Sequence, residues 1–387
     1  MDDKTFSNRF DYSLLFMIFL LFCISCLALY TAQVQHLVNG NYLLQQIIWY
    51  VIALPILALG IFVDLDIYKR LSLYIYLFCL VLILGILIAP NSIAPELNGA
   101  KGWYRIGPFS IQPTEFMKIG FIFMLSQLIS KHSENPKYDR DRFRDECILI
   151  GKMLLALLPL GYLTKELPDM GSLLVYAFIF FSVLIVSTVR FRTILLFMSP
   201  VVILLGACVY AYLAHPHFFF NTILGALPSY QAERFYGWLD SSHYTNSEGY
   251  QLQQALVTIG SGQIYGNAVG SSLVPYAYSD FVFAIIGGAY GFLGSAVLII
   301  IFFIIMYRIV IISMAYQDYY GQLVCAGIIG MIGFQLFQNI GMTVGLLPIT
   351  GLSLPFISYG GSSLVINVFA IGLVLNIKLN TRKFMFS

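Results

Sequence analysis

Carboxylates and a lysine stand at the points where polar loops of this chain run into long apolar segments. They are Asp280 in the stretch YSDF at 278–281, Asp169 in ELPDMGS at 166–172, and Glu115 with Lys118 in IQPTEFMK at 111–118. A carboxylate at such a place can take a proton from a hydroxyl, and a nearby ammonium can neutralise a departing anion. These residue types therefore suit acid–base chemistry on a negatively charged substrate.

Each motif also has a structural explanation. Glu115 and Lys118 are three residues apart on a predicted helix, so they can form an ion pair. Asp169 and Asp280 can each cap a helix N-terminus, and Gly360 and Gly361 can allow close helix packing. Ionisable groups inside membrane spans are costly, however, and usually mark function. We therefore keep both explanations open for every one of these residues.

The composition of the whole chain predicts an all-α polytopic membrane protein. Only 10% of the 387 residues are charged, 59% are apolar, and the mean hydropathy is +0.82. Apolar windows of about 20 residues predict about ten membrane-spanning helices, because lipid offers the backbone no hydrogen-bond partners. The predicted spans are 12–32, 43–63, 71–89, 113–130, 147–164, 170–188, 193–213, 281–306, 321–347 and 359–377, within a single domain covering 1–387.

The positive-inside rule orients these spans. Most of the 21 Lys and Arg residues fall on one side if both termini are cytoplasmic. The two long outer loops are then about 90–112 and about 214–280, and we expect the second to form short amphipathic helices. The cations left on the outer side are Lys101, Arg105, Lys118, Lys165 and Arg234.

With this topology the four polar motifs, 111–118, 166–172, 278–281 and 358–363, all open helices whose N-termini point outward. Such N-termini carry free N–H groups and positive dipole ends, and four of them together would favour an anion. Trp103 lies between two outer cations, either as an interfacial tryptophan or as part of the same site. The pattern favours an anionic, membrane-tethered substrate such as a lipid diphosphate.

The six cysteines lie in spans or at a cytoplasmic end, so they predict neither a disulfide framework nor a cysteine-based metal site. The charged run 131–146 is most simply a solvated cytoplasmic loop.

Five stretches, taken in order, resemble the SEDS family of polytopic peptidoglycan polymerases, which includes RodA and FtsW. They are GPFSIQPTEFMK at 107–118, PDMGS at 168–172, GYQLQQALVTIGSGQIYGN at 249–267, SDFVFAIIG at 279–287 and NIGMTVGLLPITGLSLPFISYGGSSL at 339–364. The resemblance covers nearly the whole chain, and the last stretch is the most specific. It implies a ten-helix fold in the bacterial cytoplasmic membrane, polymerisation of lipid II, and partnership with a class B penicillin-binding protein. The short tails favour a RodA-like role in cell elongation.

The resemblance also assigns residues. The essential acidic residue of the family falls on Asp280, the candidate catalytic base. The predicted substrate-binding residues are Trp103, Lys101, Arg105, Lys118, Glu115, Asp169, Gln254 and Ser358. A divalent cation, Mg²⁺ or Mn²⁺, would suit diphosphate and carboxylate oxygens.

Three departures from the family pattern change the surroundings of the candidate base. Gly287 and Gly288 stand where the family has a Glu-containing pair, Tyr276 and Tyr278 replace a Glu and a His, and Leu167 replaces a Gln.

Two other functions stay open at this point. One is a lipid II flippase, since many spans with intramembrane charges suit a transporter, and the other is a non-catalytic scaffold for the transpeptidase. A flippase needs polar groups on both faces, whereas these motifs cluster outside.

Overall fold

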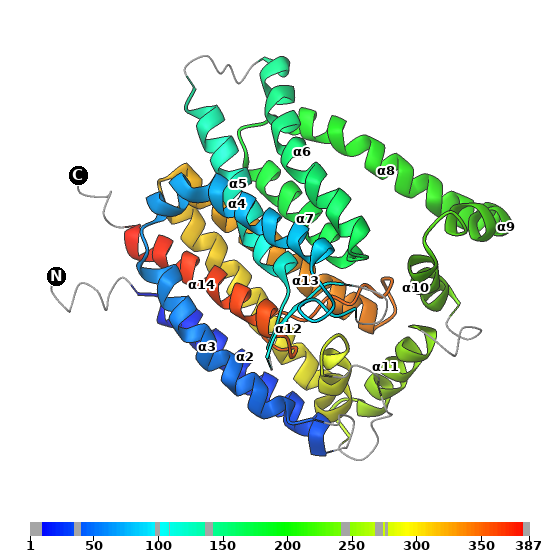
Figure 1. The fold of residues 1–387 in the computed structure, drawn as a ribbon. Helices are drawn as coiled ribbons and strands as arrows, with labels where there is room; N and C mark the ends of the chain where they lie inside the picture. The colour runs from blue at the N-terminus through cyan, green and yellow to red at the C-terminus, as the bar shows by residue number, and fades with distance from the viewer. Residues whose placement is uncertain are drawn as a thin grey trace.

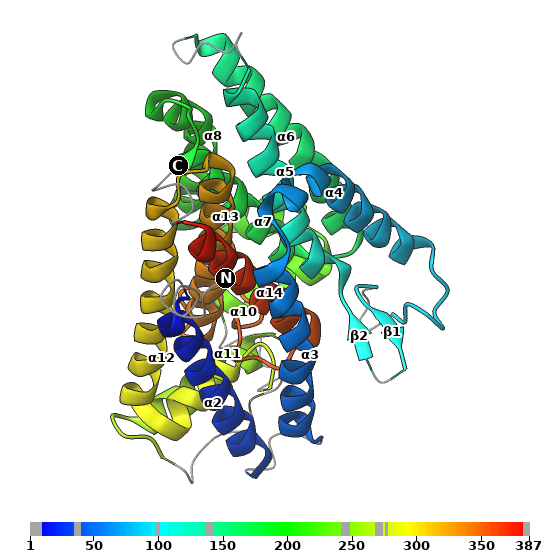
Figure 2. The ribbon, with the colours of Figure 1, turned by 90° about the vertical axis from the view of Figure 1, so that its left-hand side faces the viewer.

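The computed structural model describes residues 10–34, 40–96, 101–107, 109–135, 142–240, 248–267, 274 and 278–381. A long helix occupies each of the ten predicted spans (Figures 1 and 2). These helices are α2 (Tyr12–Val34), α3 (Tyr42–Phe62), α4 (Leu65–Ile88), α5 (Pro113–Ser133), α6 (Phe143–Glu166), α7 (Met170–Val186), α8 (Phe191–Ala214), α12 (Val282–Ala315), α13 (Tyr319–Thr343) and α14 (Gly361–Asn380).

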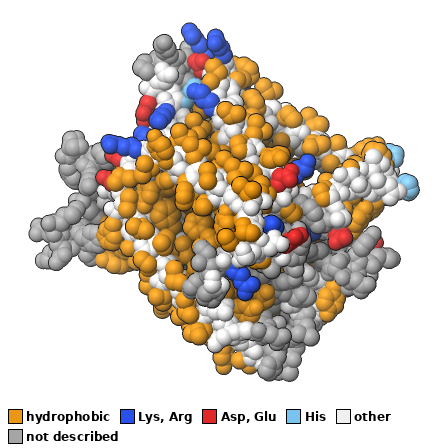
Figure 3. Space-filling model, in the orientation of Figure 1, with side chains coloured by type: hydrophobic (Ala, Val, Ile, Leu, Met, Phe, Trp, Pro, Cys, Tyr) orange, Lys and Arg blue, Asp and Glu red, His pale blue; other side chains and the backbone are white. Residues whose placement is uncertain are grey.

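Eight of these helices are long and apolar enough to cross a membrane, which agrees with the predicted fold class. The other two are α7, a shorter apolar helix of 17 residues, and α5, whose more polar side chains are mostly buried. Apolar side chains cover much of the surface over the bundle (Figure 3). We call the end at which α5, α7, α12 and α14 begin the outer end, after the orientation predicted from the sequence.

The centre of the bundle is formed by α13 and α14. In each of them 78% of the membrane-spanning stretch is buried inside the protein, whereas the corresponding value for α8 is 11%. Helix α8 accordingly lies at the periphery (Figure 1). The helices that open with polar motifs thus pack at or near the centre, where they can bring those motifs together.

The two long loops carry short elements. Strands β1 (Tyr104–Ile106) and β2 (Phe109–Ile111) form an antiparallel hairpin in the first loop, with Tyr104 opposite Ile111. The second contains α9 (Pro216–Phe218), the π-helix η1 (Phe219–Leu224), α10 (Ser229–Leu239) and α11 (Glu248–Gly262). The second loop thus contains short helices, and their amphipathic character stays a prediction.

Helix α12 is longer than the predicted span and is interrupted at Gly291, which has φ +65°. The end of α11 and the residues after it dock at this break, where the N–H groups of Phe292 and Leu293 donate to the carbonyls of Gln263 and Ile264. A side chain at residue 291 would also collide with this docked backbone. Glycine therefore permits both the turn and the close approach.

Candidate active site

The four helix N-termini of the polar motifs meet at the outer end, as the sequence predicts. Thr114 of α5 donates to Asp169 before α7 at 3.1 Å. The N–H of Gln112 donates to Ser362 of α14 at 3.0 Å. The loop before α14 is joined in turn to the loop before α12, since Ser358 donates to the carbonyl of Ser279. Motifs separated by up to 250 residues thus form one polar region.

The main chain around Asp280 is held by three hydrogen bonds from three different donors. The carbonyl of Tyr278 accepts from the N–H of Tyr359 at 2.8 Å, and the carbonyl of Ser279 accepts from Ser358 Oγ at 2.5 Å. The carbonyl of Asp280 accepts from Asn339 Nδ2 at 2.8 Å. Three consecutive carbonyls are thus occupied, which fixes the backbone that carries the Asp280 carboxylate.

Two of these donors also bind the loop between α13 and α14. Asn339 Nδ2 donates to the carbonyl of Leu352 at 2.7 Å, and Ser358 Oγ accepts from the N–H of Leu354 at 2.8 Å. Asn339 is fully buried and Ser358 nearly so. Each side chain therefore links the Asp280 loop to the α13–α14 loop by hydrogen bonds; we call these two links the staples of the Asp280 loop. The Oγ of Ser358 donates one of these hydrogen bonds and accepts the other.

Opposite Asp280, the α13–α14 loop presents Gly351. A Cβ atom at this position would lie 3.5 Å from Asp280 Oδ2 and 3.8 Å from Arg234 Nη2, and these are its two nearest atoms. Gly351 is exposed, and Asp280 and Arg234 are half-buried. The carboxylate and the guanidinium thus both lie beside the exposed backbone of Gly351.

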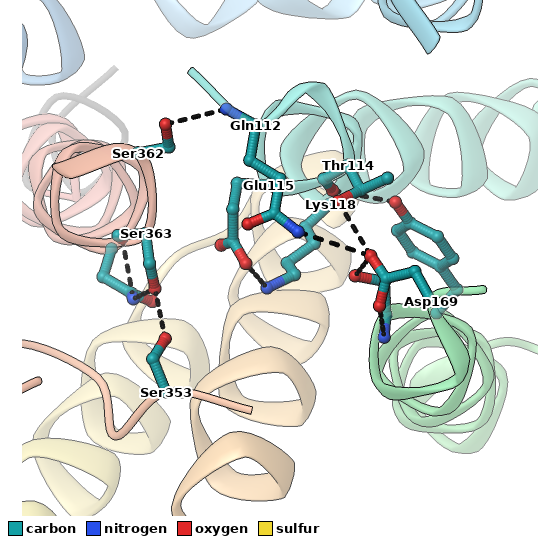
Figure 4. A network of polar contacts seen from close by, with 11 residues as sticks. Gln112, Thr114, Glu115, Lys118, Asp169, Ser353, Ser362 and Ser363 are labelled. Atoms are coloured by element: carbon teal, nitrogen blue, oxygen red, sulfur yellow. Dashed lines mark hydrogen bonds and ion pairs between the residues drawn. The ribbon is translucent and has the colours of Figure 1, made fainter. Parts of the chain in front are cut away.

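The same loop packs on the PDMGS motif. A Cβ on Gly171 would lie 3.0 Å from the side chain of Leu352 and 3.1 Å from the carbonyl of Thr350. Asp169 caps α7 by accepting from the N–H and the hydroxyl of Ser172, at 2.9 and 2.7 Å. Since it also accepts from Thr114, Asp169 joins α7 to α5 (Figure 4). These contacts support the capping explanation of this carboxylate.

Glu115 and Lys118 form a buried ion pair near this network (Figure 4). Lys118 Nζ lies 2.6 Å from Glu115 Oε1, and the side chain of Lys118 is fully buried. The ammonium is therefore shielded from solvent and neutralised by its neighbour. In this conformation the geometry favours the ion-pair explanation over direct contact of Lys118 with a phosphate.

The other predicted substrate-binding cations lie on and beside the β1–β2 hairpin. Arg105 is exposed, while Lys101 and Trp103 are half-buried. The hairpin is anchored by Tyr104, whose hydroxyl donates to the carbonyl of Leu82 at 2.8 Å, and burial raises the pKa of this phenol. The cations are thus carried by a structured hairpin, on a different element from Asp280.

The departures from the family pattern have visible consequences. Tyr278 stacks on Tyr42 of α3, with ring centroids 4.2 Å apart and an interplanar angle of 10°. At Gly288 a Cβ would come within 2.7 Å of Thr258 of α11, and at Gly287 within 3.1 Å of Ile259. Helix α11 therefore packs where a Glu pair would need space. Tyr276 lies outside the described residues.

Gln254 lies on this same helix, α11, and is half-buried; its carbonyl accepts from Thr258 Oγ1 at 2.7 Å. Its assignment to substrate binding stays a prediction.

Sequence reasoning did not assign a role to Arg234 or Asn339. The only signal for Arg234 was its place among the outer cations that the positive-inside rule leaves unexplained. Asn339 lies inside the most specific family stretch, but nothing in its type or spacing points to the carbonyl of Asp280.

Within the described ranges, no group of three or more His, Cys, Asp or Glu side chains is placed to hold a metal ion. These residues therefore offer no ready protein ligand set for the divalent cation that the sequence suggests.

Comparisons with known proteins agree on one protein family. The sequence model of a family described as "Cell cycle protein", which covers FtsW, RodA and SpoVE, matches residues 11–383. A probable peptidoglycan glycosyltransferase FtsW from Trichlorobacter lovleyi is 30% identical over 379 residues, covering 95% of this chain and 93% of that protein. Stage V sporulation protein E of Bacillus subtilis is 30% identical over 320 residues, covering 81% and 80%.

Solved structures are similar over almost the whole chain. A chain from a peptidoglycan synthase complex, solved in work on the coordination of polymerization and crosslinking, has a TM-score of 0.78 at 26% identity and covers 97% of this chain. That alignment includes 99% of the solved chain. Rod shape determining protein RodA from Thermus thermophilus has a TM-score of 0.64 at 23% identity, covering 96% of this chain and 98% of RodA.

Proposed function

We propose that this chain, which belongs to the FtsW, RodA and SpoVE family of multi-pass membrane proteins, is a peptidoglycan glycosyltransferase that polymerises lipid II. The proposal places the reaction at the outer face of the bacterial cytoplasmic membrane. Several relatives that carry the name of probable peptidoglycan glycosyltransferase match over most of their length, which supports the reaction class.

In the proposed reaction, the Asp280 carboxylate takes the proton from the 4-hydroxyl of one lipid-linked sugar. The hydroxyl oxygen then bonds to the anomeric carbon of a second sugar, and the bond between that carbon and the diphosphate oxygen breaks. The lipid diphosphate leaves with the bonding electrons, and cations on the outer side balance its charge. The hairpin residues Lys101 and Arg105 are exposed enough to take part; Lys118 would first have to leave its ion pair.

The observation that carries this proposal is the position of Asp280. Its carboxylate borders an exposed glycine, and its backbone is held by three hydrogen bonds. A general base needs this combination, since it must reach the substrate hydroxyl at about 2.6–3.2 Å and must keep its aim. Positioned bases typically contribute about 10²–10⁴-fold to the rate.

The test is glycan chain formation from purified lipid II, with moenomycin present to silence contaminating glycosyltransferases. Asp280→Asn should lower the rate by about 10²–10⁴-fold while the protein stays folded. Asp318→Asn is the matched control. Asp318 caps the N-terminus of α13, whereas Asp280 lies beside Asn339 near the C-terminal end of that helix. Wild-type activity in the Asp280 variant would remove the base, and no product from folded wild-type protein would favour the flippase or scaffold.

We further propose that the protein works with a class B penicillin-binding protein and serves cell elongation. Support for a partner comes from the similar chain in a peptidoglycan synthase complex. The similar proteins include FtsW, a stage V sporulation protein and RodA, so the comparisons do not separate a role in elongation from one in division or sporulation. Depletion of the protein in its host should produce rounded cells; filamentous cells would indicate division instead.

A further inference from the structure

Helix α10 of the second long loop brings Arg234 to the Asp280 site. Arg234 Nη1 donates to the carbonyl of Thr350 at 3.1 Å, which holds the guanidinium against the α13–α14 loop. The other terminal nitrogen, Nη2, faces the position of Gly351 that Asp280 Oδ2 also faces. One terminal nitrogen of the guanidinium therefore binds the backbone, and the other, like the Asp280 carboxylate, lies within 4 Å of the Gly351 Cβ position.

A second contact fixes α10 in this place. Trp238 Nε1 donates to the carbonyl of Gly345 at 2.9 Å. Because Trp238 follows Arg234 by four residues, both side chains project from one face of the helix. The docked face of α10 thus reaches two carbonyls of the α13–α14 loop, that of Gly345 at its start and that of Thr350 near its middle.

Other cations in the described ranges are less suited to act on Asp280. Lys118 is buried in its ion pair with Glu115, and Lys101 and Arg105 lie on or beside the hairpin. Arg234 is the described cation whose side chain comes within 4 Å of the Gly351 Cβ position. Further titratable groups on the described elements around Asp280 are Tyr42, Tyr278, Tyr359, Glu233, Asp240 and Tyr250.

We propose that Arg234 is a positioning residue that keeps the Asp280 carboxylate ionised and aimed at the acceptor hydroxyl. An adjacent opposite charge favours the charged form of a carboxyl group, and only the charged form can accept the proton. The proposal rests on the proposed function, and it makes a helix of the outer loop an essential part of the active site.

The experiment measures initial rates of lipid II polymerisation against pH for three variants. Arg234→Gln removes the charge but keeps a polar side chain, Arg234→Lys keeps the charge, and Trp238→Phe removes the second docking bond only. We expect Arg234→Gln to lose about 10–100-fold at neutral pH, with the acidic limb of its profile moved up by about one pH unit. Arg234→Lys should restore the limb to its wild-type position, and Trp238→Phe should leave the limb unmoved.

An unmoved acidic limb in Arg234→Gln would overturn the inference even if the rate falls, because loss of docking alone lowers the rate at every pH. This outcome is separable from failure of the proposed function. If wild-type protein makes no glycan, the proposed function fails, and if Asp280→Asn is as active as wild type, the assignment of Asp280 as the base fails. In either case the inference about Arg234 fails with it. If activity requires Asp280 and the limb stays in place, only the role of Arg234 is wrong.

Discussion

Asn339 offers the sharpest test of how the fold prepares its base. The side chain is fully buried, and its Nδ2 donates to the carbonyls of Asp280 and Leu352 at 2.8 and 2.7 Å. Asn339→Ala would leave both carbonyls without this donor, that of Leu352 in a buried place and that of Asp280 in a half-buried one. Each unsatisfied group costs about 1–3 kcal/mol, so the free energy of unfolding should fall by about 2–6 kcal/mol.

The effect on turnover should be larger than the loss of stability explains. Without the amide, the Asp280 loop is no longer stapled to the α13–α14 loop at this point. A displacement of about 1 Å in a reacting group can cost about 10²-fold in rate. We therefore expect turnover per folded molecule to fall by about 10–100-fold in Asn339→Ala.

Asn376 provides the matched control at the other end of the bundle. Its buried Nδ2 donates to the carbonyls of Gly60, Ile61 and Val63, at 3.2, 2.8 and 2.7 Å. Asn376→Ala thus removes the same kind of buried donor. The lost hydrogen bonds join the end of α14 to the end of α3, whereas Asp280 lies near the start of α14. Its stability should fall by a similar amount, while its turnover per folded molecule should stay within about threefold of wild type.

The assay pairs thermal unfolding in detergent with glycan formation from lipid II, and the rates are compared at equal folded fractions. Equal turnover losses in the two variants would refute the reasoning, because the damage would then follow from stability alone. Full turnover in folded Asn339→Ala would refute it as well, since the staple would not be needed to aim Asp280.

Two further predictions use matched pairs. Gly351 and Gly345 have φ of +74° and +77°, so an alanine at either position should lower the free energy of unfolding by about 1–2 kcal/mol. Only Gly351→Ala places a methyl group 3.5 Å from Asp280 Oδ2. The initial rate of glycan formation should therefore be at least about tenfold lower in Gly351→Ala than in Gly345→Ala. Similar initial rates in the two variants would show that a methyl group in contact with the carboxylate does not obstruct the substrate. Lys118→Met should cost about 3–5 kcal/mol in a thermal or denaturant unfolding assay, because it leaves Glu115 buried without its partner. Adding Glu115→Gln should restore most of that loss, whereas Lys69→Met breaks an exposed pair and should cost about 1 kcal/mol or less. A stable double variant that makes no glycan would show that this pair takes part in the reaction as well as in folding.

Local composition and spacing were enough to predict the helices of this protein. Each apolar segment must satisfy its backbone internally in lipid, so a run of about 20 apolar residues predicts a helix wherever it occurs. The polar motifs at helix starts, Asp280 among them, can also be found from the sequence, because polar residues stand out at the ends of these apolar runs. Boundaries were less accurate: α4 begins at Leu65 rather than 71, and α12 continues to Ala315 rather than 306.

Only the tertiary structure decided which polar groups meet. Arg234 and Thr350 are 116 residues apart, and Asn339 and Asp280 are 59 apart. Such contacts depend on the rotation of each helix about its axis and on the path of the loop between α13 and α14, which no local pattern encodes. The same holds for Lys118, since its type and spacing allow a phosphate ligand or an ion pair equally, and only its complete burial beside Glu115 distinguishes them.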